Sequence, residues 1–111
     1  MNRSTVLLAI VSLVGCTEGV EVEVRNSSGA AVESVVIEVT GVRYELGRIE
    51  EGEAKRTTVH PTGESTIRVF SSSLDSSFAR GPYLEPGYRG AVRVVLEGDS
   101  ARIALSDVTV Y

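Results

Sequence analysis

Strict alternation of valine with charged residues is the feature of this chain that most restricts its fold. Residues 20–25 read Val-Glu-Val-Glu-Val-Arg, so every second side chain is apolar. Successive side chains of a β-strand point to opposite faces of a sheet, and a period of two is therefore typical of a strand with one buried face. Similar alternation recurs in residues 32–40, 42–46, 66–70 and 88–97. The sequence predicts an all-β domain over residues 20–111.

The apolar members of these stretches define the predicted core. Trp is absent and only two Phe are present, so the core must be built mainly from branched aliphatic side chains. The expected inward residues are Val20, Val22, Val24, Val35, Ile37, Val39, Val42, Tyr44, Leu46, Ile67, Val69, Val92, Val94, Leu96, Ile103 and Leu105. Residues 54–60 are mostly polar and predict an edge strand, which Pro61 would close. Residues 71–82 predict the longest irregular segment, and Asp107 predicts a bulge or break in the last strand.

About seven short strands with turn residues between them favour a two-sheet sandwich. Residues 84–88, Leu-Glu-Pro-Gly-Tyr, are similar to the turn that enters the penultimate strand of immunoglobulin-like domains, where the tyrosine forms a tyrosine corner. In the usual spacing one more residue separates the glycine from the tyrosine. The resemblance implies a seven-stranded antiparallel immunoglobulin-like β-sandwich. A transthyretin-like sandwich or a small barrel would produce nearly the same pattern.

The N-terminus has the pattern of a secretory signal. Arg3 follows the α-amino group, and residues 6–14 are apolar except for Ser12. A basic head, a short apolar run and a small residue before the cut describe such a signal. The run has about half of the roughly 20 residues that a membrane-spanning helix needs. We therefore expect a signal-peptide helix over residues 1–15.

Leu13-Val14-Gly15-Cys16 resembles the lipobox of bacterial lipoproteins. The resemblance implies that residues 1–15 are removed, that Cys16 becomes the acylated first residue, and that residues 16–19 form a short tether to the membrane. Thr17 stands where Asp tends to retain such proteins in the inner membrane, which favours the outer membrane. An ordinary cleaved signal with an incidental Cys16, and a buried helix with Cys16 in its core, remain as alternatives.

Charge excludes several classes of partner. The chain has 11 basic and 15 acidic residues, and the loss of Arg3 with the signal makes it still more acidic. This balance argues against nucleic acid, whose binding depends on neutralising phosphates, and against a polybasic membrane contact. Cys16 is the only cysteine, so no disulfide is expected within the chain.

Residues suited to catalysis or metal binding are few. His60 can be combined on paper with a serine and with Asp75, Asp99 or Asp107 into a hydrolytic triad, but no nucleophile elbow supports it. A metal site would need more ligands than one histidine supplies. The acidic turn residues Glu50, Glu51 and Glu53 are typical of a solvated face. The sequence predicts a protein that is not an enzyme and that carries no metal or cofactor.

One group of residues predicts binding. Phe70, Phe78, Tyr83 and Tyr88 flank a serine-rich stretch at residues 71–77. Loops on rigid sandwiches often bind partners, and aromatic side chains are favoured anchors. The alternative is that these rings cap the core. We expect a non-catalytic module that binds an envelope protein or glycan through this segment or the polar edge 55–60; otherwise, we expect a structural envelope component without its own ligand.

Overall fold

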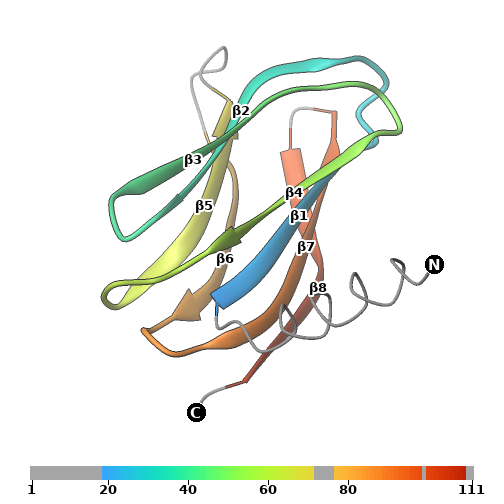
Figure 1. The fold of residues 1–111 in the computed structure, drawn as a ribbon. Helices are drawn as coiled ribbons and strands as arrows, with labels where there is room; N and C mark the ends of the chain where they lie inside the picture. Colours follow the sequence, from blue (N-terminus) through green and yellow to red (C-terminus); the bar gives the residue numbers. More distant parts are fainter. Residues whose placement is uncertain (1–18, 72–76, 99, 110–111) are drawn as a thin grey trace, which may run out of the picture.

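Eight strands make up the chain in the computed structural model, which describes residues 19–71, 77–98 and 100–109 (Figure 1). Residues 1–18, with the predicted signal and Cys16, lie outside these described residues. The strands are β1 (Gly19–Asn26), β2 (Val32–Val39), β3 (Val42–Ile49), β4 (Ala54–Val59), β5 (Ser65–Ser71), β6 (Ser77–Leu84), β7 (Arg89–Glu97) and β8 (Ser100–Thr109).

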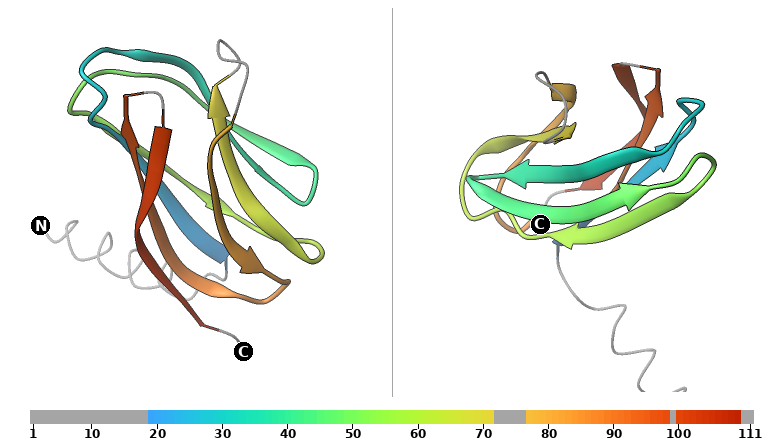
Figure 2. Two further views of the ribbon diagram at one scale, coloured as in Figure 1. Left: turned by 180° about the vertical axis from the view of Figure 1, so that it is seen from behind. Right: turned by 90° about the horizontal axis from the view of Figure 1, so that it is seen from above.

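The strands form two four-stranded sheets that pack face to face as a sandwich (Figures 1 and 2). The first sheet has the order β4-β1-β7-β8 and the second has the order β3-β2-β5-β6. The predicted all-β sandwich is confirmed, and the barrel alternative is excluded because the two sheets do not close into one. β3 contacts β4 along one side of the sandwich, and β6 contacts β8 along the other.

The order of the strands decides between the two sandwich alternatives. In an immunoglobulin sandwich the first two strands lie in one sheet, in the order 1-2-5-4. Here β1 and β2 lie in different sheets, so the order is not that of an immunoglobulin sandwich, and the transthyretin-like sandwich remains as the alternative. β1 also runs parallel to β7, whereas the sequence predicted antiparallel pairing throughout. Alternation identifies inward residues but not the sheet to which a strand belongs, so it could not decide the order.

The strand directions give the sandwich two distinct ends. At the end that we call the terminal end, Gly19 of β1 pairs with Arg89 of β7, which pairs with Thr109 of β8. The turns that follow β2, β4 and β6 lie at the same end. The loops that follow β1, β3 and β7 lie at the other end, which we call the loop end. The start of β1 and the end of β8 are therefore separated only by β7.

The core consists of aliphatic side chains from both sheets. It contains Val20, Val22, Val24, Val35, Ile37, Val39, Ile49, Val59, Ile67, Val69, Leu84, Val92, Val94 and Leu96, none more than 1% exposed. Burying each contributes about 1.5–3 kcal/mol relative to leaving it exposed. Tyr44, Leu46 and Ile103 are partly buried against this core, as predicted. Val42 was predicted to face inward but is 44% exposed, because it begins an edge strand beside a tight turn.

Two irregular features predicted from the sequence differ in the structure. Residues 77–82 belong to β6 rather than to a loop, because pairing with β5 holds a segment whose serine, glycine and proline disfavour a strand. The register shift in the last strand lies at Ala104 rather than Asp107, since Arg93 pairs with Leu105 while Val94 pairs with Ile103. Both features depend on pairing with the preceding strand, β5 in the first case and β7 in the second.

Candidate functional site

The four aromatic residues predicted to bind do not form one patch. Phe70 lies on the outer face of the second sheet, opposite the buried face that carries Ile67 and Val69. Tyr83 pairs with Thr66, which places it on the same outer face but near the terminal end. Tyr88 packs against the core, as the capping alternative predicted for it. Phe78 belongs to β6, and its side chain lies outside the described residues.

Phe70 is held between two arginines. The Arg43 guanidinium lies over its ring at 5.1 Å from the centroid, and the Arg68 guanidinium at 5.2 Å. Such cation–π contacts contribute about 0.5–1 kcal/mol at exposed sites. Arg68 also forms an ion pair with Glu38 on the neighbouring strand. The ring therefore positions two cationic groups on this face, and one of them is already neutralised.

A shallow hollow of about 260 Å³ lies beside Phe70, between β2 and β3. It is lined by Ser34, Val35, Val36, Arg43, Glu45 and Gly47. Val36 pairs with Glu45 of β3 on one side and with Phe70 of β5 on the other. Although it points to the outer face, Val36 is only 4% exposed, so it forms an apolar floor beneath charged walls.

An irregularity in the backbone of β2 lies at this hollow. The pairing of β2 with β3 shifts register on both sides of Val35, which is a β-bulge. Ser34 within the bulge has a φ of 52°, a left-handed conformation that costs a non-glycine residue about 1–2 kcal/mol. Bulges of this kind are common beside functional sites because they redirect side chains.

The hollow was not predicted from the sequence, although the chain carries a signal for it. Val35, Val36 and Ile37 are three consecutive apolar residues in a strand where alternation requires the middle one to be polar. Val36, the middle residue, points to the outer face and lines the hollow together with Val35. An apolar residue at an outward position of a half-buried strand therefore indicated a covered or binding surface.

The charged residues around the hollow differ in whether they form ion pairs. Among the described residues, neither Arg43 nor Glu45 forms an ion pair, whereas Glu38 is bound to Arg68. Both Arg43 and Glu45 are exposed side chains on the same face of β3, two residues apart. The hollow thus offers, above an apolar floor, one cation and one carboxylate that form no ion pair with the part of the chain that the structure describes.

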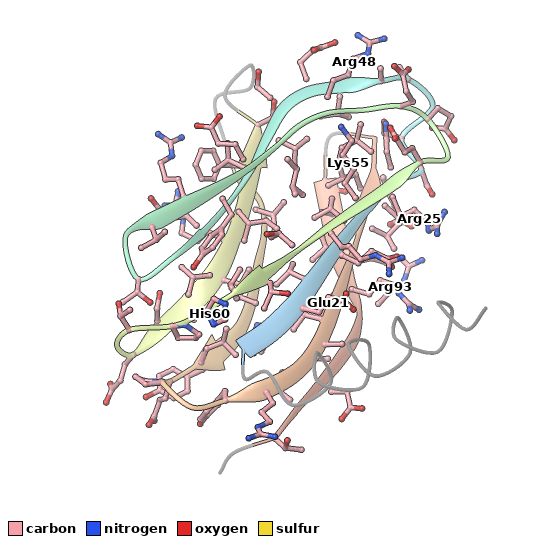
Figure 3. All side chains as sticks on the ribbon, in the orientation of Figure 1. Glu21, Arg25, Arg48, Lys55, His60 and Arg93 are labelled. Carbon is pink, nitrogen blue, oxygen red and sulfur yellow. The ribbon has the colours of Figure 1, made fainter. Side chains whose placement is uncertain are left out.

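A second, smaller hollow of about 90 Å³ lies on the outer face of the first sheet. Its central carboxylate, Glu23, lies 2.7 Å from the Arg93 guanidinium and 3.6 Å from that of Arg56, so its charge is neutralised from both neighbouring strands. Figure 3 shows Glu21 and Arg93 on this part of the sheet. This arrangement is a ladder of ion pairs across β4, β1 and β7, and we assign it a structural role.

His60 does not assemble a triad with Asp107. The histidine follows β4 at one edge of the first sheet, and Asp107 belongs to β8 at the opposite edge. Three strand spacings separate these edges, or about 14 Å. The His60 backbone N–H donates a hydrogen bond of 3.2 Å to the Tyr44 hydroxyl, and its ring lies close to the Gly19 backbone (Figure 3). Asp75 and Asp99 lie outside the described residues.

The predicted edge strand β4 is confirmed, but its free side is partly covered. Lys55 pairs with the core residue Val24 and therefore lies on the inner side of the sheet. Its ammonium group donates a hydrogen bond of 3.3 Å to the Leu46 carbonyl of β3. An inward-pointing charge at an edge discourages pairing with another strand. Strand addition along residues 55–60 is therefore disfavoured by the side chains that bridge β4 to β3.

The predicted acidic cluster organises the loop end. Glu51 Oε1 accepts a hydrogen bond of 2.6 Å from the Gly29 N–H, and Glu53 Oε1 accepts one of 2.9 Å from the Glu50 N–H. Hydrogen bonding to Arg48, 2.7 Å away, lowers the pKa of the exposed Glu50 carboxyl. These carboxylates therefore fasten the loop that follows β3 rather than gather around a ligand.

Tyr83 makes a strong contact of its own at the terminal end. Its hydroxyl donates a hydrogen bond of 2.6 Å to Glu85, which raises the pKa of the phenol. The side chain is 45% exposed. Tyr83 is therefore an accessible aromatic ring. It lies apart from Phe70, because its pairing partner Thr66 is four residues before Phe70 on β5.

Within residues 19–71, 77–98 and 100–109, no group of three His, Cys, Asp or Glu side chains is arranged to hold a metal ion. The same residues include no helix that is long and apolar enough to cross a membrane. Comparison with known proteins finds no family model, no curated protein and no solved structure that matches the chain.

Proposed function

We propose that this protein is a lipid-anchored, non-catalytic binding module of the bacterial cell envelope, attached through acylated Cys16. The observation that carries the proposal is the short distance in sequence between the lipobox cysteine and the folded domain. β1 begins at Gly19, only three residues after Cys16. At about 3.5 Å per residue, this tether spans roughly 10 Å.

The position of the tether orients the domain. Because β1 starts at the terminal end, this end would lie next to the lipid headgroups in either leaflet. The loop end would point away from the bilayer, and the outer faces of both sheets would stand upright and open to solvent. Attachment to the outer membrane, favoured by Thr17, is part of the proposal.

A binding role is supported by the outer face of the second sheet. It presents the exposed aromatic ring of Tyr83, the arginine-flanked ring of Phe70 and the hollow between β2 and β3 on a rigid scaffold. Ligand sites on proteins are typically concave, with an apolar lining and a few placed polar groups. Of the surfaces expected from the sequence, the outer face around Phe70 is better suited to binding than the covered edge of β4.

The anchor is tested by replacing Cys16 with serine. Cys16→Ser removes the thiol that would carry the lipid, so the protein should move from the membrane pellet to the soluble fraction. Two or more acyl chains are needed for stable anchoring. Because the variant lacks all of them, nearly all of the protein should leave the membrane fraction. Fractionation and immunoblotting measure the change, and intact mass of the native protein shows the acylated cysteine directly.

Ser12→Ala in the apolar run serves as the matched control and should leave the protein in the pellet. A Cys16→Ser protein that still pellets with membranes, or a mature N-terminus other than Cys16, would refute the anchor.

A structural component without its own ligand is the alternative function. The neutralised ion-pair ladder on the first sheet is the observation that favours a purely scaffolding face. If the protein only spaces an envelope assembly, a co-purified partner should be retained when Arg43 and Phe70 are replaced together. Loss of that partner would favour the binding module.

A further inference from the structure

We propose that the hollow between β2 and β3 binds a carboxylated sugar unit of an envelope glycan. This inference rests on the proposed role as an envelope binding module and names its ligand class. The site consists of Arg43, Glu45, Ser34 and Val36, with Phe70 as the residue that positions Arg43.

The size of the hollow favours a single small unit. Its volume of about 260 Å³ lies just below the roughly 300–1,000 Å³ of pockets that enclose drug-sized ligands. Gly47 contributes no side chain to the wall, and nothing lies within 4 Å of the position that a Cβ would take there. The hollow is therefore open enough for one unit of a longer chain to enter while its neighbours remain outside.

The charges of Arg43 and Glu45 favour a ligand that carries a single carboxylate. The Arg43 guanidinium is a planar fork of donors that matches a carboxylate in a two-point hydrogen bond. It has no ion-pair partner among the described residues, so an incoming carboxylate does not have to displace one. Glu45 stands two residues away and repels a second negative charge. A ligand with one carboxylate therefore fits better than a phosphate polymer.

The remaining groups suit the rest of a sugar ring. The Glu45 carboxylate can accept hydrogen bonds from ring hydroxyls, and the Ser34 hydroxyl can both donate and accept. Val36 offers an apolar floor on which the C–H face of the ring can rest. An acidic peptide would use Arg43 but would leave the floor and the Glu45 carboxylate without suitable partners.

Phe70 acts through Arg43. The Arg43 guanidinium lies 5.1 Å from the centre of the Phe70 ring, which restricts a side chain that is otherwise long and exposed. A restricted donor loses less conformational entropy when it binds. The strained φ of 52° at Ser34 and the bulge around it further indicate that this part of β2 is shaped for more than sheet pairing.

The test uses the full chain, purified in detergent, with two sources of the same ligand chemistry. Isothermal titration at low salt compares trigalacturonate and N-acetylmuramic acid with the neutral sugar galactotriose. We expect at least one carboxylated sugar to bind and galactotriose to bind tenfold more weakly or not at all. Arg43→Gln should weaken the binding at least tenfold, because it removes the charge that pairs with the carboxylate.

Arg102→Gln is the matched control, since it removes an arginine that pairs with Glu97 on the first sheet. It should leave the affinity unchanged.

For the positioning role, Phe70→Tyr should retain binding while Phe70→Leu weakens it severalfold, with equal thermal midpoints for the two variants. Equal affinity for neutral and carboxylated sugars, no binding of either carboxylated sugar, or equal losses from Arg43→Gln and Arg102→Gln would each overturn the assignment.

An acidic peptide that binds through Arg43 while both carboxylated sugars fail would also overturn it and would identify a protein partner. The outcome is separate from that of the anchor. Membrane fractionation of Cys16→Ser tests the attachment without any sugar, and the titration tests the hollow without any membrane.

Discussion

Asn26 is the residue on which the loop end most depends. Its side chain is fully buried, and its amide Nδ2 donates hydrogen bonds of 2.7 Å to the Ala30 carbonyl and 2.9 Å to the Ile49 carbonyl. Its Oδ1 accepts from both the N–H and the hydroxyl of Ser28. One side chain thereby joins the loop that follows β1 to the end of β3. In the sequence Asn26 begins an Asn-Ser-Ser-Gly run, whose residue types are common in turns.

We predict that Asn26→Ala lowers the free energy of unfolding by about 2–4 kcal/mol, since each buried polar group left unpaired costs roughly 1–3 kcal/mol. Urea denaturation followed by circular dichroism measures the change. Ser27→Ala, at an exposed neighbour, should change stability by less than about 0.5 kcal/mol. Similar values for the two variants would show that the buried amide is not the fastening point.

Gly90 is required by a close approach between β7 and β8. Its φ is 132°, and a Cβ there would overlap the Asp107 carbonyl oxygen and lie 2.8 Å from the Val108 Cα. We predict that Gly90→Ala destabilises the protein by more than about 3 kcal/mol, the upper range for a single substitution. Gly98→Ala is the control, because its φ of 64° is strained for alanine but its surroundings are open. It should cost only about 1–2 kcal/mol. Equal thermal shifts for the two would contradict a steric cause.

At the scale of the element, β4 shows how an edge strand is protected. Lys55 lies in register with Val24, yet its ammonium group reaches out to the Leu46 carbonyl of β3. An apolar residue at this inward position would leave the backbone of β4 available to another strand. The charged side chain of Lys55 thus discourages another strand from pairing with this edge.

We predict that Lys55→Val increases self-association, because it removes the charge that guards the edge. Sedimentation velocity over a range of concentrations should show a larger average mass than for the unsubstituted chain. Thr58→Val, which adds a similar apolar group on an exposed position of the same strand, is the control. If both variants sediment as the unsubstituted chain does, Lys55 does not guard the edge.

The second element of note is β2, where three apolar residues in succession accompany a bulge. Alternation would have placed a polar residue at position 36, and a regular strand would have exposed it. The bulge instead leaves Val36 at 4% exposure beside an open hollow. The candidate ligand-binding groups therefore lie where β2 departs from strict alternation.

At the scale of the whole molecule, the sandwich has a direction relative to its proposed anchor. β1 has eight residues, so the terminal end and the loop end are separated by about 25 Å. Both Gly19 and Thr109 lie at the terminal end. A tether at Cys16 would hold that end at the membrane and leave the loop end free.

We predict that a fluorescent probe at the terminal end is quenched by spin-labelled lipid headgroups more strongly than one at the loop end. Thr62→Cys and Ser27→Cys provide exposed labelling sites at the two ends. The anchored protein should show the difference, and the same labels on a Cys16→Ser background should show none. Stronger quenching at residue 27 would place the domain the other way up.

Local pattern in the sequence was sufficient to predict the strands other than β6 and most of the core. The alternation of residues 20–25 determined which side of β1 is buried, because the side-chain period of a strand is a property of its own backbone. For the same reason Val92, Val94 and Leu96 were assigned correctly to the core.

Only tertiary contacts decided the strand order, the parallel pairing of β1 with β7, the existence of β6 and the hollow beside Phe70. Each depends on which segments lie next to each other, and the periodic pattern of one segment carries no information about the strand beside it. Arg43 and Phe70 are 27 positions apart by number, yet β2 brings them within 5.1 Å, since it pairs with β3 on one side and β5 on the other.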